Sequence, residues 1–158
     1  MITKEFILAG RAIFTLQVPP TYRGPQDSIV RGHYTYRVRH KAADTDHKEA
    51  WFVQLLTGPD NSNDYTYLGM LYPGVIDDKS VTFQLTSASK HNDKSVPVIL
   101  LRQLLKRVWA GEQHLIEEAG FKLHHEGKCA RCGKKLTTPE SVTAGFGKEC
   151  LEILQGVR

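Results

Sequence analysis

The stretch RAIFTLQVPP, residues 11–20, decides the fold class because its apolar side chains fall at every second position. The even positions from 12 to 18 are all apolar, whereas Arg11, Thr15 and Gln17 lie in the other set. A period of two is typical of a β-strand that buries one of its faces. We therefore expect a strand over residues 11–18, which the two prolines after it bring to an end.

Four later segments that are separated by turns also predict strands, one of them (residues 50–57) with apolar side chains on both faces, as expected for a central strand. They cover residues 33–40, 50–57, 65–72 and 81–87. Five successive strands joined by short turns predict an antiparallel meander, which is either an open sheet or a small barrel. The pattern of side chains leaves both shapes open.

The period changes after the fifth strand, where apolar residues recur at helical spacing. Ser95 favours the N-cap position, and the pattern after it predicts an amphipathic helix over residues 96–109 that covers one face of the sheet. A shorter helix is expected over residues 111–120, ending at a glycine as helices commonly do. This combination of sheet and helices is an α+β fold.

The composition of the 158 residues is ordinary for a globular protein, with 41% hydrophobic and 24% charged residues. No apolar run approaches the length that spans a bilayer, and the first ten residues lack the pattern of a secretory signal, so we expect a cytoplasmic protein. The formal net charge is +4, with an isoelectric point near 9.0. Residues 1–89 hold nine basic and nine acidic side chains, so the whole excess lies in residues 90–158.

All three cysteines, Cys129, Cys132 and Cys150, lie in this basic C-terminal part. An odd number in one short segment excludes a disulfide framework for the whole chain and favours a metal in a reducing compartment. In CARCGKK, residues 129–135, a glycine follows the Cys-x2-Cys pair, and such a tight turn points main-chain N–H groups at thiolate sulfurs. We expect one structural Zn²⁺ ion; the alternative is three buried, reduced cysteines that bind no metal.

A closed tetrahedral zinc site needs a fourth ligand, and two histidines precede the cysteines. If residues 121–125 are extended, Leu123 and His125 share the inward face of that segment. We therefore favour His125 as the fourth ligand and keep His124 as the alternative. The predicted ligand set is His125, Cys129, Cys132 and Cys150.

The sequence between the second and third cysteines predicts how the chain returns to the metal. Thr138 is a favoured N-cap residue followed by a proline, so a short helix is expected to begin there. Gly145 and Gly147 end this helix, and Cys150 lies at the start of a last helix in KECLEILQG, residues 148–156.

These expectations combine into an α+β fold of two parts. Residues 1–110 form the five-stranded antiparallel meander or small barrel, packed by the amphipathic helix. Residues 111–158 form a small helical zinc knuckle, in which metal binding is expected to supply most of the folding free energy.

The stretch CARCGKKLTTPESVTAGFGKEC, residues 129–150, resembles a small zinc-binding domain of unknown function that occurs in many bacteriophage proteins and is appended to some bacterial Snf2-type helicases. The resemblance covers about residues 124–151. Its motif is Cys-x-x-Cys-Gly-Arg-x-Leu-Thr-x-Pro-x-Ser-x-x-x-Gly-x-Gly-Pro-x-Cys. Lys134 and Lys148 stand where the motif has arginine and proline, and neither is a predicted ligand.

The rest of the chain resembles the N-terminal part of uncharacterised phage proteins of this length, whose genes tend to lie in replication and recombination regions. The resemblance implies a phage protein in the host cytoplasm that is accessory to DNA replication or recombination. A host or phage replication protein is then an expected partner.

No motif of a catalytic site is found, and the adjacent Asp77 and Asp78 fit a turn between strands. We therefore expect a protein that is not an enzyme and binds nucleic acid, with DNA favoured. Basic residues on the amphipathic helix and around the cysteines are the candidate phosphate contacts: Arg102, Lys106, Arg107, Lys128, Arg131, Lys134 and Lys135. The alternative for those near the cysteines is that they only balance the thiolate charge.

Tyrosines at alternate strand positions suggest a second kind of contact. Tyr34, Tyr36, Tyr65 and Tyr67, with two nearby arginines, could stack on single-stranded bases. The alternative is ordinary packing, since strand tyrosines more often belong to a core or a cross-strand pair. A rival function for the whole chain is a protein-binding adaptor or inhibitor of a host or phage enzyme.

Overall fold

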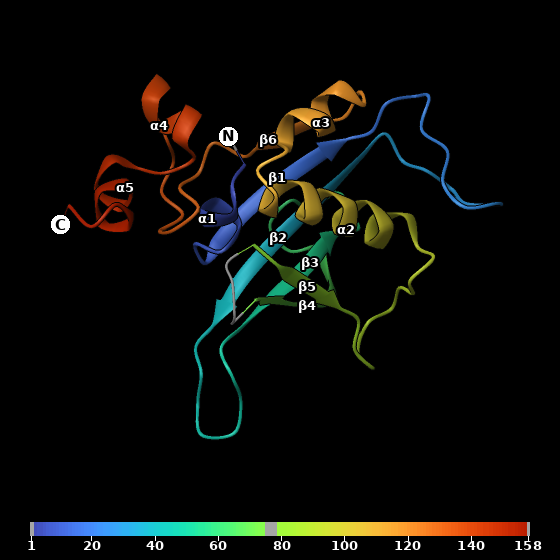
Figure 1. Ribbon diagram of the computed structural model, residues 1–158, viewed down its shortest axis with the longest axis horizontal. Helices are drawn as coiled ribbons and strands as arrows, with labels where there is room; N and C mark the ends of the chain where they lie inside the picture. Colours follow the sequence, from blue (N-terminus) through green and yellow to red (C-terminus); the bar gives the residue numbers. More distant parts are fainter. Residues whose placement is uncertain (1, 75–78, 158) are drawn as a thin grey trace.

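The computed structural model describes residues 2–74 and 79–157, which contain one antiparallel sheet with strand order β5-β4-β3-β2-β1-β6. The strands are β1 (Arg11–Gln17), β2 (His33–Lys41), β3 (Ala50–Leu56), β4 (Tyr65–Pro73), β5 (Val81–Gln84) and β6 (Lys122–His125). The sheet is strongly curled (Figure 1), and it stays open because β5 and β6 lie at opposite ends of the strand order. The predicted turn at Asp77 and Asp78 lies outside the described residues.

The predicted meander of β1 to β5 is confirmed, but the strand count of five is wrong because β6 joins the sheet beside β1. Without β6, one edge of β1 would have unpaired main-chain groups. β6 pairs antiparallel with β1, with Leu16 opposite Leu123 and Phe14 opposite His125. The C-terminal part of the chain therefore completes a sheet that begins at the N-terminus.

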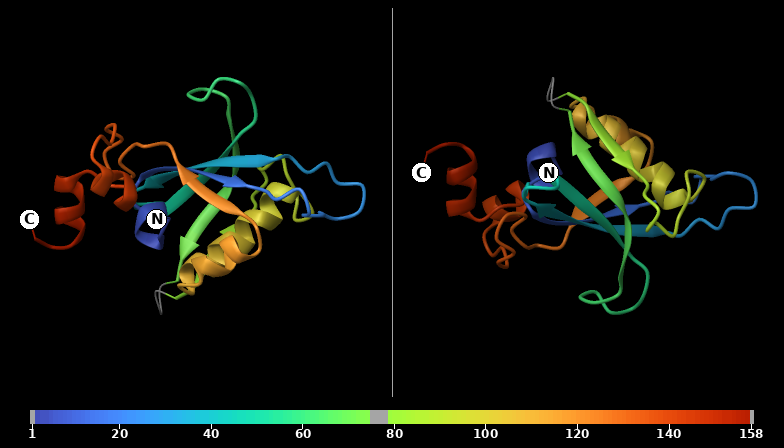
Figure 2. Two further views of the ribbon diagram at one scale, coloured as in Figure 1. Left: turned by 90° about the horizontal axis from the view of Figure 1, so that it is seen from above. Right: turned by 90° about the horizontal axis from the view of Figure 1, so that it is seen from below.

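Five helices occur in the described residues: α1 (Lys4–Ile7), α2 (Val96–Trp109), α3 (Gln113–Glu118), α4 (Pro139–Ala144) and α5 (Lys148–Leu154). The amphipathic helix predicted over residues 96–109 is confirmed as α2, which covers one face of the sheet (Figure 2). None of the described helices has the length and apolarity needed to cross a membrane.

The core lies between α2 and the face of the sheet that it covers. Its fully buried side chains include Phe14 and Tyr36 from the sheet and Leu101 from α2. The Tyr36 hydroxyl donates a hydrogen bond of 2.7 Å to the carbonyl of Pro97, so the first turn of α2 is tied to the middle of β2.

The opposite face of the sheet, called here the outer face, has none of the five described helices over it. α1, α2 and α3 lie on the other side, whereas the loop between β3 and β4 and part of the segment between β6 and α4 rise on the outer side (Figure 2). Antiparallel sheets commonly leave one face in contact with water.

The division into residues 1–110 and 111–158 stays a prediction, and two features cross it. β6 belongs to the sheet, and one continuous apolar cluster includes both Phe6 of α1 and Cys129, Phe146 and Cys150 near the C-terminus. Figure 1 shows α4 and α5 beyond α1 at one end of the sheet, where the C-terminus also lies.

Candidate metal centre

Residues 127–136, called here the cysteine loop, form a tight turn that main-chain hydrogen bonds close. The Cys129 N–H donates to the Lys134 carbonyl at 2.8 Å, and the Leu136 N–H donates to the Gly127 carbonyl at 2.7 Å. The Gly133 N–H donates to the Cys129 carbonyl at 2.8 Å, and Gly133 has φ +80, which favours glycine. The turn therefore fixes Cys129 and Cys132 side by side.

Two short helices bring the third cysteine to this loop. α4 begins as predicted at Thr138, whose Oγ1 accepts from the N–H of Ser141 at 3.3 Å. It ends at Gly145, which has φ +78 and whose carbonyl accepts from the N–H of Ala130 at 3.0 Å. The chain then turns through Phe146, and Cys150 lies on α5.

The three sulfurs lie within 4.8 Å of one another, and they form a group that could hold a metal ion. In a tetrahedral zinc site with Zn–S bonds of 2.3 Å the sulfurs are about 3.8 Å apart, so the cluster needs only a small contraction to fit. Thiolates are soft ligands that select zinc or similar metals. The donor set therefore fits zinc, with three cysteine ligands contributed by the cysteine loop and α5.

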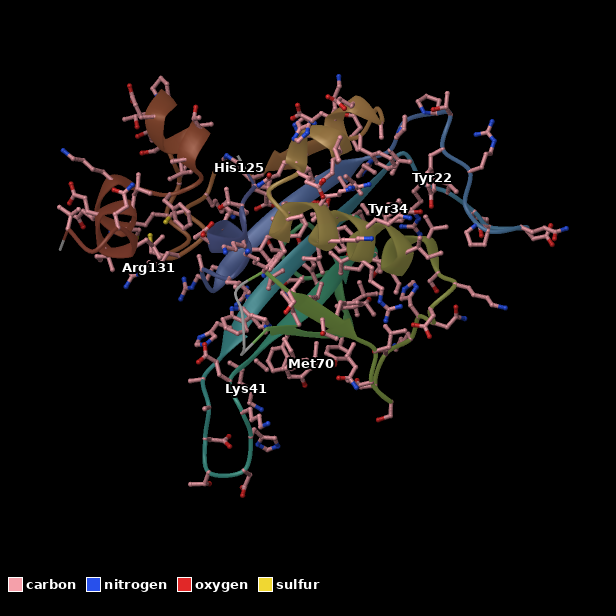
Figure 3. The ribbon with its side chains drawn as sticks, viewed as in Figure 1. Tyr22, Tyr34, Lys41, Met70, His125 and Arg131 are labelled. Atoms are coloured by element: carbon pink, nitrogen blue, oxygen red, sulfur yellow. The ribbon has the colours of Figure 1, made fainter. Side chains whose placement is uncertain are left out.

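The surroundings of the sulfurs favour the thiolate form of one of them. Burial raises the pKa of the Cys129 thiol, but N–H groups of Cys132, Gly147 and Arg131 donate to its sulfur and bring the pKa down to about 7. Burial raises the pKa of Cys150, with Arg131 opposing this rise and the neighbouring thiols adding to it. The Arg131 Nη1 lies 3.5 Å from the Cys150 sulfur. Figure 3 shows Arg131 among the C-terminal segments of the chain.

The predicted fourth ligand, His125, is not part of the sulfur group, which within the described residues contains no histidine and no carboxylate. The Gly127 N–H donates to its Nδ1 at 2.9 Å, so the proton of the neutral ring is on Nε2, which donates to the Val142 carbonyl. As a ligand His125 stays a prediction, and coordination would require it to give up one of these bonds. His124 points to the outer face, where its Nε2 lies 3.2 Å from Gln17 Oε1.

A buried phenylalanine joins the metal centre to the N-terminus. The Phe6 ring is fully buried, with its centroid 5.8 Å from that of His125 and 6.0 Å from that of Phe146. Arg11 adds a second connection, because its main-chain N–H donates to Ala130 and its Nη1 donates to the carbonyl of Cys132 at 3.1 Å. Neither residue was identified from the sequence, where no local pattern links them to the cysteines.

The predicted phosphate contacts fall into two separate groups. Arg102, Lys106 and Arg107 lie on α2, and two of them have acidic partners: Arg102 with Asp93 at 2.6 Å and Arg107 with Glu112 at 3.2 Å. Lys128, Arg131, Lys134 and Lys135 lie in the cysteine loop. In the loop, the main chains of Lys128 and Lys135 form an isolated antiparallel β-bridge. The Lys128 Nζ lies 3.7 Å from Glu126 Oε2, and the Arg131 side chain contacts the Cys150 sulfur.

The four tyrosines do not share a face. Tyr34 and Tyr36 point into the core, so packing is their role here, whereas Tyr65 and Tyr67 lie half-buried on the outer face. The two strands that carry these tyrosines are not neighbours, because β3 lies between β2 and β4. Alternation predicts which residues share a face, but it does not say which face a helix will cover.

Replacing Arg131 with alanine is expected to weaken zinc binding by about 10–100-fold, the usual cost of removing a group that supports a ligand. The change removes the positive charge beside the Cys150 sulfur. Competition with a chelator of known zinc affinity would measure the effect. Lys134→Ala is the matched control because it removes a charge from the same loop at an exposed position. Equal affinities of the two variants would contradict the assignment.

Comparison with known proteins finds a match for one part of the chain. Residues 124–155 match a family of unknown function, DUF6011. No curated protein matches the chain, and no solved structure matches it. The matched residues run from β6 through the cysteine loop to the end of α5, so the family match and the sulfur cluster describe the same segment.

Proposed function

We propose that this protein binds nucleic acid through a cysteine loop that one structural zinc ion holds in shape. The observation that carries the proposal is that Lys134 and Lys135 project from the loop and have no acidic partner among the residues that the structure describes. Three thiolates around one divalent ion leave a net negative charge, which Arg131 offsets from the same loop. The lysines are then available for phosphates.

The proposed role of the metal is structural, and the proposed function is binding without catalysis. The Cys129 side chain is fully buried, Cys150 is 7% exposed and Cys132 is half-buried, so two of the three sulfurs are closed to a substrate unless the loop opens. For a segment of this size, metal binding supplies much of the free energy of folding.

The proposed setting is a phage protein in the host cytoplasm that is accessory to DNA replication or recombination, with DNA as the favoured ligand. The support for this setting is the resemblance of residues 124–151 to a domain of many phage proteins. A phage or host replication protein is the proposed partner.

Reversing the charge of the two free lysines is expected to weaken binding. With labelled DNA, single-stranded or duplex, at about 50 mM salt, the variant Lys134→Glu/Lys135→Glu should lose affinity and its salt dependence should flatten by about 0.7–0.9 per lost phosphate contact. Fluorescence anisotropy across a salt series would measure both quantities.

The control is Lys90→Glu/Lys94→Glu, which makes the same change of charge at two exposed positions in the loop before α2. Equal losses in the two double variants would mean that net charge, and not the cysteine loop, governs binding. Absence of binding by the unaltered protein at low salt would refute the proposal.

A second candidate, a protein-binding adaptor or inhibitor, has one observation in its favour. The C-terminal end exposes apolar side chains: Ile153 and Leu154 are 40% and 44% exposed, and Val157 is 72% exposed. Apolar groups at the end of a small segment suit a protein partner. Co-purification of one phage or host replication protein at stoichiometric yield, with no DNA binding at low salt, would favour this candidate.

A further inference from the structure

The outer face of the sheet carries a row of side chains that crosses five strands. Cross-strand pairing places Arg11 of β1 opposite Arg39 of β2, Arg39 opposite Phe52 of β3, Phe52 opposite Met70 of β4, and Met70 opposite Gln84 of β5. Arg11 and Arg39 are exposed, and Phe52 and Met70 are half-buried. Positive charge therefore lies at one end of the row, with flat and apolar surface next to it.

A neighbouring row has the same character and is held rigidly. Arg37 lies opposite Gln54, which lies opposite Tyr67, and the Arg37 Nε donates to Gln54 Oε1 at 2.8 Å. The Arg37 guanidinium stacks over the ring of Tyr65 at 4.0 Å from its centroid. The Lys41 Nζ also lies over an aromatic ring, 5.8 Å from the centroid of Phe52. Figure 3 shows Lys41 and Met70 in the lower part of the sheet.

The charged end of the outer face continues into the cysteine loop. Arg11 contacts the loop through its main chain at Ala130 and through its side chain at Cys132. One basic surface therefore runs from Lys134 and Lys135 through Arg11 to Arg39. This surface leads to the aromatic residues of the outer face. Glu126 is the acidic group that influences Arg37 and Tyr65 there, and it is paired with Lys128.

The basic residues of α2 do not belong to this surface. α2 covers the other face of the sheet (Figure 2), and Arg102 and Arg107 are paired with acidic side chains. A ligand on the cysteine loop meets the outer face before it meets α2, because Arg11 joins the loop to that face directly.

We propose that the outer face binds a single strand of nucleic acid, with phosphates on Arg39, Arg11 and the loop lysines and bases stacked on Phe52 and Tyr67. A single strand fits because its unpaired bases can lie flat on aromatic rings of an open sheet, whereas the bases of a duplex are already stacked. This inference rests on the proposed nucleic-acid binding and adds to it the strandedness of the ligand and the location of the site.

The test compares variants of the full chain by fluorescence anisotropy with a labelled oligothymidylate of about 20 nucleotides and a duplex of equal length. Phe52→Leu and Tyr67→Leu keep apolar side chains but remove the rings, and each is expected to weaken single-strand binding by about 5- to 150-fold. Arg39→Ala is expected to flatten the salt dependence by about 0.7. Lys106→Ala is the matched control, since it removes an exposed charge from α2, and it should bind as the unaltered protein does.

A second measurement does not depend on the folding of any variant. Ultraviolet cross-linking of the unaltered protein to bromodeoxyuridine-substituted single strands should attach label to peptides that contain Phe52, Tyr65 or Tyr67. Tighter binding of the duplex, or cross-links and losses confined to α2, would overturn the inference and leave the proposed function standing. No binding of either oligonucleotide would remove both.

Discussion

Replacing Cys129 with serine is expected to remove the metal from the protein and to unfold residues 126–157. Structural zinc contributes about 10–16 kcal/mol in small zinc-binding peptides. The whole stability of a typical domain is about 5–15 kcal/mol, so this segment cannot replace the loss with its few apolar contacts. Metal analysis should fall from one ion per chain to none, and hydrogen exchange in the segment should become fast.

The same variant tests how far the loss spreads. Because Phe6 packs against His125 and Phe146, and because β6 is a strand of the sheet, faster exchange should extend to α1 and to β1 but not to β3 and β4. Thr137→Ser is the control, since it alters an exposed residue near the same loop. A reduced, unaltered protein that contains no metal and still protects its C-terminal amides would contradict the metal assignment.

Replacing Gly145 with alanine is expected to destabilise the protein by about 2–5 kcal/mol, for two reasons that add. Gly145 has φ +78, a conformation that costs a residue with a Cβ about 1–2 kcal/mol. An added Cβ would also lie 2.5 Å from the Phe6 ring, which is fully buried and cannot move aside freely. Equilibrium unfolding of the metal-loaded protein in urea measures the change.

Gly147→Ala is the matched control for this prediction, and only a small change in stability is expected. Gly147 has φ −64, and nothing lies within 4 Å of the Cβ that the change would add. Alanine fits that conformation and reduces the freedom of the unfolded chain, a gain of about 0.4–1 kcal/mol, but Gly147 is the N-cap of α5, where alanine is less favourable than glycine. The two effects oppose each other, so a net change of less than about 1 kcal/mol is expected. Similar losses at both glycines would show that the Phe6 contact does not determine the requirement at residue 145.

The sequence alone predicts the parts of the fold that depend on local pattern. Local strand patterns identify β1 to β5, and helical spacing with Ser95 locates α2. α1 was not predicted because it is a single turn, and β6 was not counted because its four residues become a strand only by pairing with β1 far away in the chain. Long-range pairing has no signal in a short window of sequence.

The same contrast between local pattern and long-range contacts applies to the candidate site. The spacing of the three cysteines predicts a group that the structure brings together, and the alternation of residues 121–125 correctly turns His125 inward and His124 outward. Spacing does not predict that main-chain groups bind both ring nitrogens of His125, or that Asp93 pairs with Arg102. Those partners depend on where the sheet places distant segments.

The position of β1 between β2 and β6 has a consequence for biosynthesis. Gln17 and His124, which meet across the β1–β6 pair, are separated by 107 positions, so β1 leaves the ribosome long before its second neighbour exists. At about 5–20 residues per second, its free edge waits roughly 5–20 s in the nascent chain. Such an edge is a template for aggregation. The proposed zinc ion would hold the cysteine loop that directly follows β6, so scarcity of zinc during translation is expected to lower the soluble yield of newly made protein more than it harms molecules that have already matured.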